Sequence, residues 1–248
     1  MKGAVYLVGA GPGAADLLTL RAARLLGEAD VVLYDALVGG QILSLASQAR
    51  LIPVGKRAGR SSMDQRLICR LLVRLAMRHR TVVRLKGGDP HLFGRAAEEL
   101  AACRAAGVPV ATVPGVTAAF AAASSLCFSL TKRGLARSVT FVTPTVGRGQ
   151  SIDQHWAKAA AAAETVVVYM GAQQAALVQA ALMAHGAPEC WPVALVESAS
   201  LPEERFAAGV LMSLTTIAAD LGQGPVLLIM GEAARSATEA LALAREAA

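Results

Sequence analysis

Residues 5–16 read VYLVGAGPGAAD, and this stretch decides the fold. A run of β-branched and apolar residues predicts a buried strand, and the glycines after it predict a loop where a ligand can approach the backbone. Gly9, Gly11 and Ala14 satisfy the loose G-x-G-x-x-A form of a dinucleotide-binding loop, and Asp35 follows the next apolar run, where a ribose-binding carboxylate is expected. The sequence therefore predicts a nucleotide-like ligand at the end of the first strand.

The start of the first helix separates a dinucleotide from other nucleotide-like ligands. In a dinucleotide fold this helix begins on the second glycine, because its N-terminal amides hold the pyrophosphate. Here Pro12 and Gly13 favour a turn, and Thr19 is the best N-cap for the helical period of LRAARLL. We therefore expect a wide, exposed glycine loop that suits a ligand without phosphates, such as an amino acid or a nucleoside.

Strand-like and helix-like segments alternate along the chain. Amphipathic helical stretches at 20–26, 63–77 and 95–105 separate apolar runs in the first half. The runs that predict strands are 4–8, 31–34, 51–54, 81–85, 108–113, 139–143, 165–169, 193–197, 205–211 and 226–230. The stretch PGVTAA at 114–119 interrupts this alternation, which then restarts. We therefore expect an α/β protein of two α/β domains, residues 1–115 and 116–248.

The two sheets are expected to differ in strand direction. The βαβα pattern of the first domain predicts parallel strands that are covered by helices. The stretch PEERFAAGVLMSL at 202–214 has a short turn before it and can pair antiparallel with the preceding strand. The second sheet is therefore predicted to be mixed.

The composition excludes several classes of protein. The four cysteines show no C-x-x-C pairing and the four histidines are scattered, so we expect neither a disulfide framework nor a metal site. No charged-then-apolar leader precedes the first strand, which predicts a cytoplasmic protein. The uncharged stretch 105–131 is long enough to span a membrane, but its prolines and glycines predict a buried strand, a turn and a small-residue helix instead.

The net charge of +6 favours an acidic ligand, because the arginine fork matches carboxylates and phosphates, although a compositional bias explains the charge equally well.

The helix at 63–77 carries a basic stripe at four-residue spacing, made of Arg66, Arg70, Arg74 and Arg78. Its opposite apolar face is expected to comprise Leu67, Ile68, Leu71, Leu72 and Leu75. The stripe is interpreted as a solvated face. A nucleic-acid footprint is the alternative, but no stacking aromatic residues accompany it.

A second glycine loop follows the strand at 81–85, in the stretch RLKGGDP. Taken alone, Gly87, Gly88, Asp89 and Pro90 describe an ordinary turn. Ligands of open α/β sheets, however, bind at the carboxyl ends of the strands. Two glycine loops at the carboxyl ends of parallel strands are therefore predicted to converge on one crevice.

Eight motifs together resemble one family, with a similarity that extends from residue 5 to about residue 232: VGAGPG, DVVLYDALV, VGKRAG, RLKGGDPHLFGRAAEE, VPGVTAA, LTKRGLARSVTFVT, VVVYMG and GPVLLIMGE. They are similar to the uroporphyrinogen-III C-methyltransferases of siroheme, cobalamin and heme d1 synthesis. The resemblance implies the two-domain tetrapyrrole methylase fold, a homodimer, a uroporphyrinogen III substrate, and S-adenosylmethionine in a cleft between the domains. The first loop is thus expected to admit a folded S-adenosylmethionine, not a dinucleotide.

The resemblance also implies site residues. Asp35 in LYDALV is implied as the proton acceptor and Lys56 in VGKRAG as the proton donor. Arg95 and Glu98, one helical turn apart, are rival acid–base or substrate-binding residues, and the base stays open between Asp35 and Arg95. Arg133 is expected to meet substrate carboxylates. Cofactor contacts are expected at Pro12, Gly87, Gly88, Asp89, Leu92, Thr117, Ala118, Met170, Ala199 and Val226.

The implied reaction is methylation of uroporphyrinogen III at two pyrrole carbons, C2 and C7, to give precorrin-2. Such a transfer needs an aligned donor and acceptor and a base for the departing proton. The chain departs from the family pattern at 14–16, 96–97, 132 and 144–145. These departures keep two alternatives open: a related precorrin methyltransferase of cobalamin synthesis, or an impaired variant of the same enzyme. A ligand sensor that binds nucleic acid is the alternative from another class.

Overall fold

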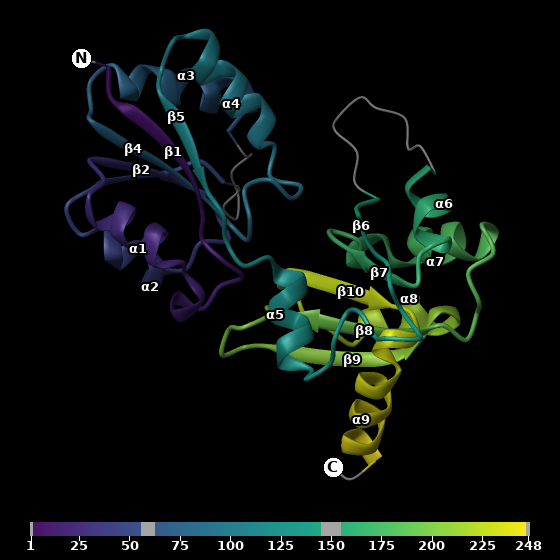
Figure 1. Cartoon of the computed structure of the whole chain (residues 1–248). Coiled ribbons are helices and arrows are strands. Elements are labelled where there is room, and N and C mark those ends of the chain that lie inside the picture. Colours follow the sequence, from purple (N-terminus) through teal and green to yellow (C-terminus); the bar gives the residue numbers. More distant parts are fainter. Residues whose placement is uncertain (1, 56–62, 145–154, 247–248) are drawn as a thin grey trace. The chain divides into compact units, whose positions relative to one another are not determined.

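The computed structural model describes residues 2–55, 63–144 and 155–246 of the chain. The residues divide into two compact units, Met1–Ala118 and Ala119–Ala248 (Figure 1). Each unit has its own five-stranded sheet with helices packed against it. The predicted α/β class with two α/β domains is therefore confirmed.

The sheet of the first unit is entirely parallel. Its strands lie in the order β3-β2-β4-β1-β5 and every neighbouring pair runs in the same direction. Their bounds are β1 (Ala4–Gly9), β2 (Val31–Tyr34), β3 (Arg50–Pro53), β4 (Thr81–Lys86) and β5 (Val110–Val113). Because parallel strands all end at the same edge of a sheet, the loops after them share that edge.

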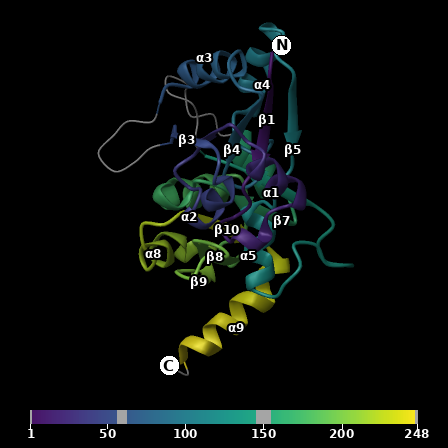
Figure 2. The ribbon, with the colours of Figure 1, turned by 90° about the vertical axis from the view of Figure 1, so that its left-hand side faces the viewer.

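Helices cover both faces of this sheet (Figures 1 and 2). One face packs against α1 (Leu20–Gly27) and α2 (Gly40–Leu43), and the other packs against α3 (Gln65–Ala76) and α4 (Ala96–Ala105). Successive residues of β4 alternate between the two cores, as the period of a strand requires: Val83 lies in the first core and Val82 in the second. Helix α2 was not predicted from the sequence.

The first helix begins where its capping residue predicts. The Thr19 hydroxyl accepts a hydrogen bond from the Ala22 amide at 3.2 Å, and α1 starts at Leu20. The loop before it is not the exposed loop that we expected, because Gly11 and Gly13 are buried. A short 3-10 helix at Ala15–Leu17 folds back over the glycines, so that a Cβ on Gly11 would lie 3.3 Å from the Leu17 carbonyl oxygen.

The basic stripe, formed by three arginines of α3 and by Arg78 just after its end, is solvent-exposed, as predicted. Ile68, Leu72 and Leu75 on its apolar side are buried, Leu71 is half-buried, and Leu67 is 48% exposed. The inclusion of Leu67 in the apolar face was therefore wrong. Leu67 and the exposed Arg74 are seven residues apart, about two helical turns, so Leu67 lies on the solvated side of the helix.

The sheet of the second unit is mixed, as predicted. Its order is β6-β7-β10-β8-β9, with a parallel β6–β7 pair and antiparallel pairs elsewhere. Its strands are β6 (Val139–Val142), β7 (Thr165–Val168), β8 (Pro192–Glu197), β9 (Arg205–Val210) and β10 (Val226–Met230). Its helices are α5 (Ala118–Ser125), α6 (His155–Ala161), α7 (Ala175–Ala184), α8 (Leu214–Ala219) and α9 (Arg235–Glu246). Within the ranges that the structure describes, no helix has the length and apolar character needed to cross a membrane.

Cys103, fully buried on α4, gives the first unit a pH-dependent stability. Burial, with smaller effects of Cys69 and Glu99, raises the pKa of its thiol from 9.0 to about 11. Because the folded state holds this proton more tightly, its contribution of about 2 to 3 kcal/mol is fully present below pH 9 and is lost as the pH rises to 11.

We therefore expect urea denaturation to show that Cys103→Ala loses less stability than the wild type between pH 8.5 and pH 11. The same comparison at pH 7, where the thiol is protonated in both states, gives the packing cost of the substitution alone. Parallel losses of stability in the two proteins would contradict the assignment.

Candidate functional site

The two glycine loops of the first unit meet at the carboxyl edge of its sheet. Gly11, after β1, and Gly88, after β4, exchange two backbone hydrogen bonds of 3.2 and 2.7 Å. Both glycines have positive φ values, of 73° and 65°, which favour residues without a side chain. The prediction that the two loops converge is therefore confirmed.

A third backbone segment, at Gly115, packs against these loops. A Cβ on Gly9 would lie 2.6 Å from the backbone of Gly115 and 2.7 Å from the Gly88 carbonyl oxygen, so no side chain fits there. A Cβ on Gly88 would meet nothing closer than the Thr117 Cα, at 4.0 Å. The loops therefore form a backbone cradle that is closed behind Gly9 and has room in front of Gly88.

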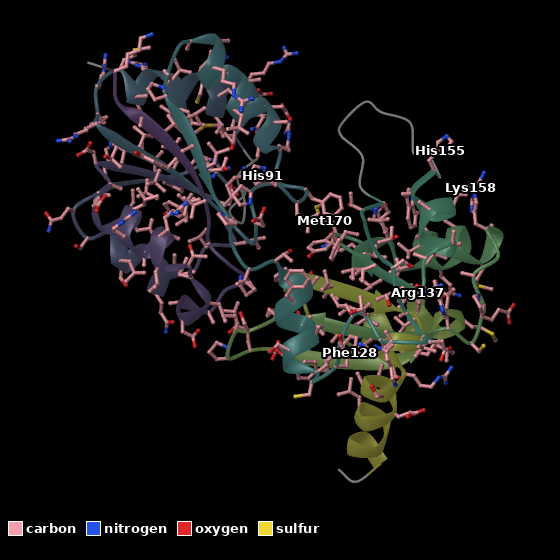
Figure 3. All side chains as sticks on the ribbon, in the orientation of Figure 1. His91, Phe128, Arg137, His155, Lys158 and Met170 are labelled. Atoms are coloured by element: carbon pink, nitrogen blue, oxygen red, sulfur yellow. The ribbon has the colours of Figure 1, made fainter. Side chains whose placement is uncertain are left out.

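Asp89 fastens this cradle. One of its carboxylate oxygens accepts a hydrogen bond from the His91 amide at 2.8 Å, and the other accepts one from the Gly115 amide at 2.9 Å. Figure 3 labels His91 in this loop. A carboxylate offers about four acceptor positions, so Asp89 keeps the capacity to accept from a ligand hydroxyl or ammonium group.

The other expected cofactor residues of this unit lie in the same three segments. Pro12 is half-buried in the first loop. In the second loop, the amide of half-buried Leu92 donates to the Asp89 carbonyl at 3.3 Å. Thr117 is buried and Ala118 is the first residue of α5, both directly after the Gly115 segment. The sequence thus located these residues on segments that the fold brings together at one edge.

Asp35 lies at that same edge, in the loop after β2. Its side chain is 30% exposed and pairs with the Arg84 guanidinium, with 2.5 Å between Oδ1 and Nη2. The Asp35 amide donates to the Leu85 carbonyl, and its carbonyl accepts from the Val38 amide. Asp35 is therefore fixed at both its backbone and its carboxylate while part of the carboxylate reaches solvent.

Behind Asp35 lies a buried group of charges that sequence reasoning missed. Its centre is Glu99 of α4, whose carboxylate accepts from the Arg84 Nε at 3.0 Å, from the Lys86 Nζ at 3.2 Å and from the Gln65 Nε2 at 3.1 Å. We call Gln65, Arg84, Lys86 and Glu99 the Glu99 network. All four are buried. The available signal was the pair of cations at alternate positions of an otherwise apolar strand, TVVRLK.

The charges of the Glu99 network act on one another. Burial and the neighbouring Arg84 lower the pKa of Lys86, while Glu99 and Asp35 oppose this effect by stabilising the ammonium group. With Asp35 included, two carboxylates face two cations in an alternating chain. This balance is what permits ionised side chains in such a buried position.

Arg95 and Glu98 form a separate, exposed pair at the start of α4. Their side chains meet in two hydrogen bonds of 2.7 and 2.8 Å. The helix begins at Ala96, one residue later than predicted, because Arg95 adopts a left-handed conformation with a φ of 55°. The hydrogen bonds that Arg95 donates to the Glu98 carboxylate raise the pKa of Arg95, which keeps its guanidinium protonated. This state suits anion binding better than proton abstraction.

Lys56, the residue implied as proton donor, lies outside the described residues. So does residue 145, one of the positions where the chain departs from the family pattern. Two other departures, Ala96 and Ala97, lie in the first turn of α4, where alanine is the best helix former. These alanines therefore favour the first turn of the helix that carries Glu98 and Glu99.

The expected cofactor residues of the second unit lie at one edge of its sheet. Met170 follows β7, Ala199 follows β8, and Val226 opens β10, which runs antiparallel to both. Met170 is exposed and has a φ of 55°; Figure 3 labels it. Ala199 is buried and Val226 is half-buried. The topology thus places all three at the same edge of this sheet.

Arg133 is exposed in the turn 132–136. Hydrogen bonds between Lys132 and Ala136 close this turn.

The second unit also has an apolar pocket, lined by Phe120, Ala123, Ser124, Phe128, Ser129, Leu130, Thr131, Val139 and Phe141. These lining residues include no charged side chain. The pocket therefore does not suit a ligand rich in carboxylates.

Residues 4–215 match the family of tetrapyrrole (corrin/porphyrin) methylases. The chain belongs to this family. A relative among the tetrapyrrole methylases, a uroporphyrinogen-III C-methyltransferase from Paracoccus denitrificans, is 45% identical over 242 residues, which cover 96% of this chain and 83% of that protein. A siroheme synthase from Azotobacter vinelandii is 46% identical over 235 residues, which cover 94% of this chain and 50% of that protein. The chain thus spans about half the length of the siroheme synthases that it matches.

Solved structures of tetrapyrrole methylases share the fold. Uroporphyrin-III C-methyl transferase from Thermus thermophilus, complexed with S-adenyl homocysteine, is 42% identical with a TM-score of 0.82, and the match covers 94% of this chain and 100% of that one. A cobalt precorrin-4 methyltransferase is 27% identical with a TM-score of 0.81, covering 92% of this chain and 95% of that one. The match to both supports the assignment to the family across nearly the whole chain.

Proposed function

We propose that this chain is an S-adenosylmethionine-dependent C-methyltransferase that methylates uroporphyrinogen III at C2 and C7 to give precorrin-2. The observation that carries the proposal is the pairing of Gly11 with Gly88 beside Asp35, at one edge of a parallel sheet. The printed names of the relatives give the substrate class. The product is an intermediate for siroheme, cobalamin or heme d1 synthesis.

The residues at the sheet edge fit a nucleoside ligand without phosphates. The space in front of Gly88 lets the ligand approach the backbone, and Asp89 has acceptor capacity for hydroxyl or ammonium groups. The α-helix that follows β1, α1, begins only at Leu20, so its N-terminal amides are not placed at the first glycine loop for a pyrophosphate. We propose that Pro12, Gly87, Leu92, Thr117, Ala118, Met170, Ala199 and Val226 provide the further contacts.

Bound S-adenosylmethionine supplies an electrophilic methyl group on a sulfonium. The electron pair of an electron-rich pyrrole carbon forms the new carbon–carbon bond, and the pair of the broken carbon–sulfur bond stays on sulfur. The macrocycle then loses one proton, which removes the positive charge that the transferred methyl group brought. We assign Asp35 as the acceptor of this proton, because its carboxylate is partly exposed at the proposed cofactor edge and is held in place by an ion pair with Arg84. Lys56 remains the proposed proton donor.

Exposed arginines are proposed to bind the carboxylates of the substrate. Arg95 stays protonated beside Glu98, and Arg133 projects from an exposed turn. The base role that the sequence left open between Asp35 and Arg95 is therefore assigned to Asp35, with Arg95 and Glu98 in substrate binding. We further propose that the protein is cytoplasmic and that it forms a homodimer. Light scattering on the purified protein tests the homodimer.

The proposal is tested with anaerobically prepared uroporphyrinogen III, S-adenosylmethionine and the purified chain. Mass spectrometry is expected to show a product heavier by two methyl groups, with a matching amount of S-adenosylhomocysteine. Calorimetry is expected to show S-adenosylhomocysteine binding without substrate. A tetrapyrrole of unchanged mass would overturn the proposed substrate.

A related precorrin methyltransferase is the second candidate, favoured by the likeness to the cobalt precorrin-4 enzyme. It is expected to bind the same cofactor but to leave uroporphyrinogen III unmethylated and to methylate a precorrin. Tight, salt-dependent binding of duplex DNA without any cofactor binding would instead support the sensor alternative.

A further inference from the structure

We propose that Arg84 is a positioning residue for Asp35, and that Glu99 fixes Arg84 for this task. The inference rests on the proposed function, in which Asp35 accepts the proton. Arg84 is only 3% exposed, whereas Asp35 is 30% exposed, so the carboxylate alone faces the space open to a ligand. Arg84 therefore acts through Asp35 and not on the substrate.

Three nitrogens of the Arg84 guanidinium bind three different partners. Nη2 donates to the Asp35 carboxylate, Nε donates to Glu99 at 3.0 Å, and Nη1 donates to the Leu85 carbonyl at 3.1 Å. A guanidinium is rigid and planar, so contacts in three directions fix its position and its orientation. The position of Nη2, and with it that of the Asp35 Oδ1, is thereby set by the fold.

The Leu85 carbonyl links the two residues a second time. It accepts from the Arg84 Nη1 at 3.1 Å and from the Asp35 amide at 3.3 Å. Both the backbone and the side chain of Asp35 are thus held by the same short piece of β4. Displacement of Arg84 is expected to release the carboxylate while the backbone contact remains.

Stability alone does not account for the Glu99 network. Buried ion pairs cost desolvation energy, and well-packed apolar residues often replace them with no loss of stability. Glu99 is fully buried and accepts hydrogen bonds from Gln65, Arg84 and Lys86. Of these three donors, only Arg84 also donates to another acidic side chain among the described residues, namely Asp35. The Glu99 carboxylate pairs with Lys86 and with the Nε of Arg84. The Nη2 of Arg84 is therefore available to Asp35.

The test uses Arg84→Met, Arg84→Lys, Asp35→Asn and the double variant Arg84→Met/Asp35→Asn in the full chain. Arg84→Met is expected to lower kcat by about 10- to 100-fold, with KM and the dissociation constant for S-adenosylhomocysteine changed by less than about twofold. Arg84→Lys keeps the charge but lacks the three-way fork, so it is expected to recover only part of kcat.

The double variant separates positioning from a structural role. If Arg84 acts through Asp35, the double variant is expected to be no slower than Asp35→Asn alone. Multiplied losses in the double variant would overturn the inference, as would a wild-type kcat in Arg84→Met. The exposed Arg74→Met on α3 is the matched control and is expected to leave all three constants unchanged.

A spectroscopic readout keeps the inference independent of the proposed function. The carboxyl carbon resonance of Asp35, assigned by its loss in Asp35→Asn, is expected to move in Arg84→Met and to stay in Arg74→Met. If the wild type fails to methylate uroporphyrinogen III, the proposed function fails but this resonance still reports the contact. An unmoved resonance overturns the inference.

If Arg84→Met does not fold, Glu99→Gln replaces it. The amide keeps the shape of the carboxylate and removes its charge. The Glu99→Gln variant is likewise expected to have a lower kcat than the wild type.

Discussion

Asp35→Asn is expected to slow methyl transfer to uroporphyrinogen III by about 10²- to 10⁴-fold, the range that a positioned general base contributes. The amide keeps an oxygen that can accept from Arg84, but it cannot take up the departing proton. Because Asp35 lies in a loop separate from the paired glycines, the affinity for S-adenosylhomocysteine is expected to stay within about twofold.

Single-turnover measurements on the purified variant check the rate, and calorimetry checks the affinity. Glu28→Gln, an exposed carboxylate-to-amide change at the end of α1, is the matched control and should retain the wild-type rate. Turnover equal to that of the wild type would remove Asp35 from the base role. A large loss of cofactor affinity would instead assign Asp35 to cofactor binding.

Gly9→Ala is expected to lower the free energy of unfolding by about 2 to 4 kcal/mol, because overpacking against backbone atoms cannot be relieved by a rotamer change. The new methyl group would lie 2.6 Å from the backbone of Gly115 and 2.7 Å from the Gly88 carbonyl oxygen. To make room, the second loop must move away from the first. We therefore also expect binding of S-adenosylhomocysteine to weaken by at least about tenfold, a 1.4 kcal/mol effect.

Gly27→Ala is the matched control, because a Cβ at this helical position has no atom within 4 Å. It is expected to raise stability by about 0.5 to 1 kcal/mol, through the reduced freedom of the unfolded chain, and to leave cofactor affinity unchanged. Urea denaturation and calorimetry measure both effects. Equal stability of Gly9→Ala and the wild type would contradict the close backbone contact behind the cradle.

The local pattern of the sequence predicted the elements that depend on neighbouring residues. Apolar runs located the strands of both sheets, and Thr19 fixed the start of α1 through a bond to a residue three positions away. The short-turned segment at 202–214 predicted the antiparallel strand of the second sheet. These features follow from side-chain periodicity and capping, which a short window of sequence contains.

The position of the candidate site was also predictable, because parallel strands share one carboxyl edge. Two glycine loops after β1 and β4 had to lie on that edge, and the hydrogen bonds between Gly11 and Gly88 show that they meet there. The burial of Gly11 and Gly13 was not predictable, because it depends on a short 3-10 helix that folds back over them.

By itself, the sequence determined two α/β units and the edge at which glycines and Asp35 gather. Only the tertiary structure decided which charges Asp35 faces. Glu99 is 15 residues from Arg84 and 34 residues from Gln65, and it reaches both because α3 and α4 pack on the same face of β4. Pairing across such separations depends on how helices dock on a sheet. Periodicity predicts which face of a helix is buried, but not which residues of two distant elements meet there.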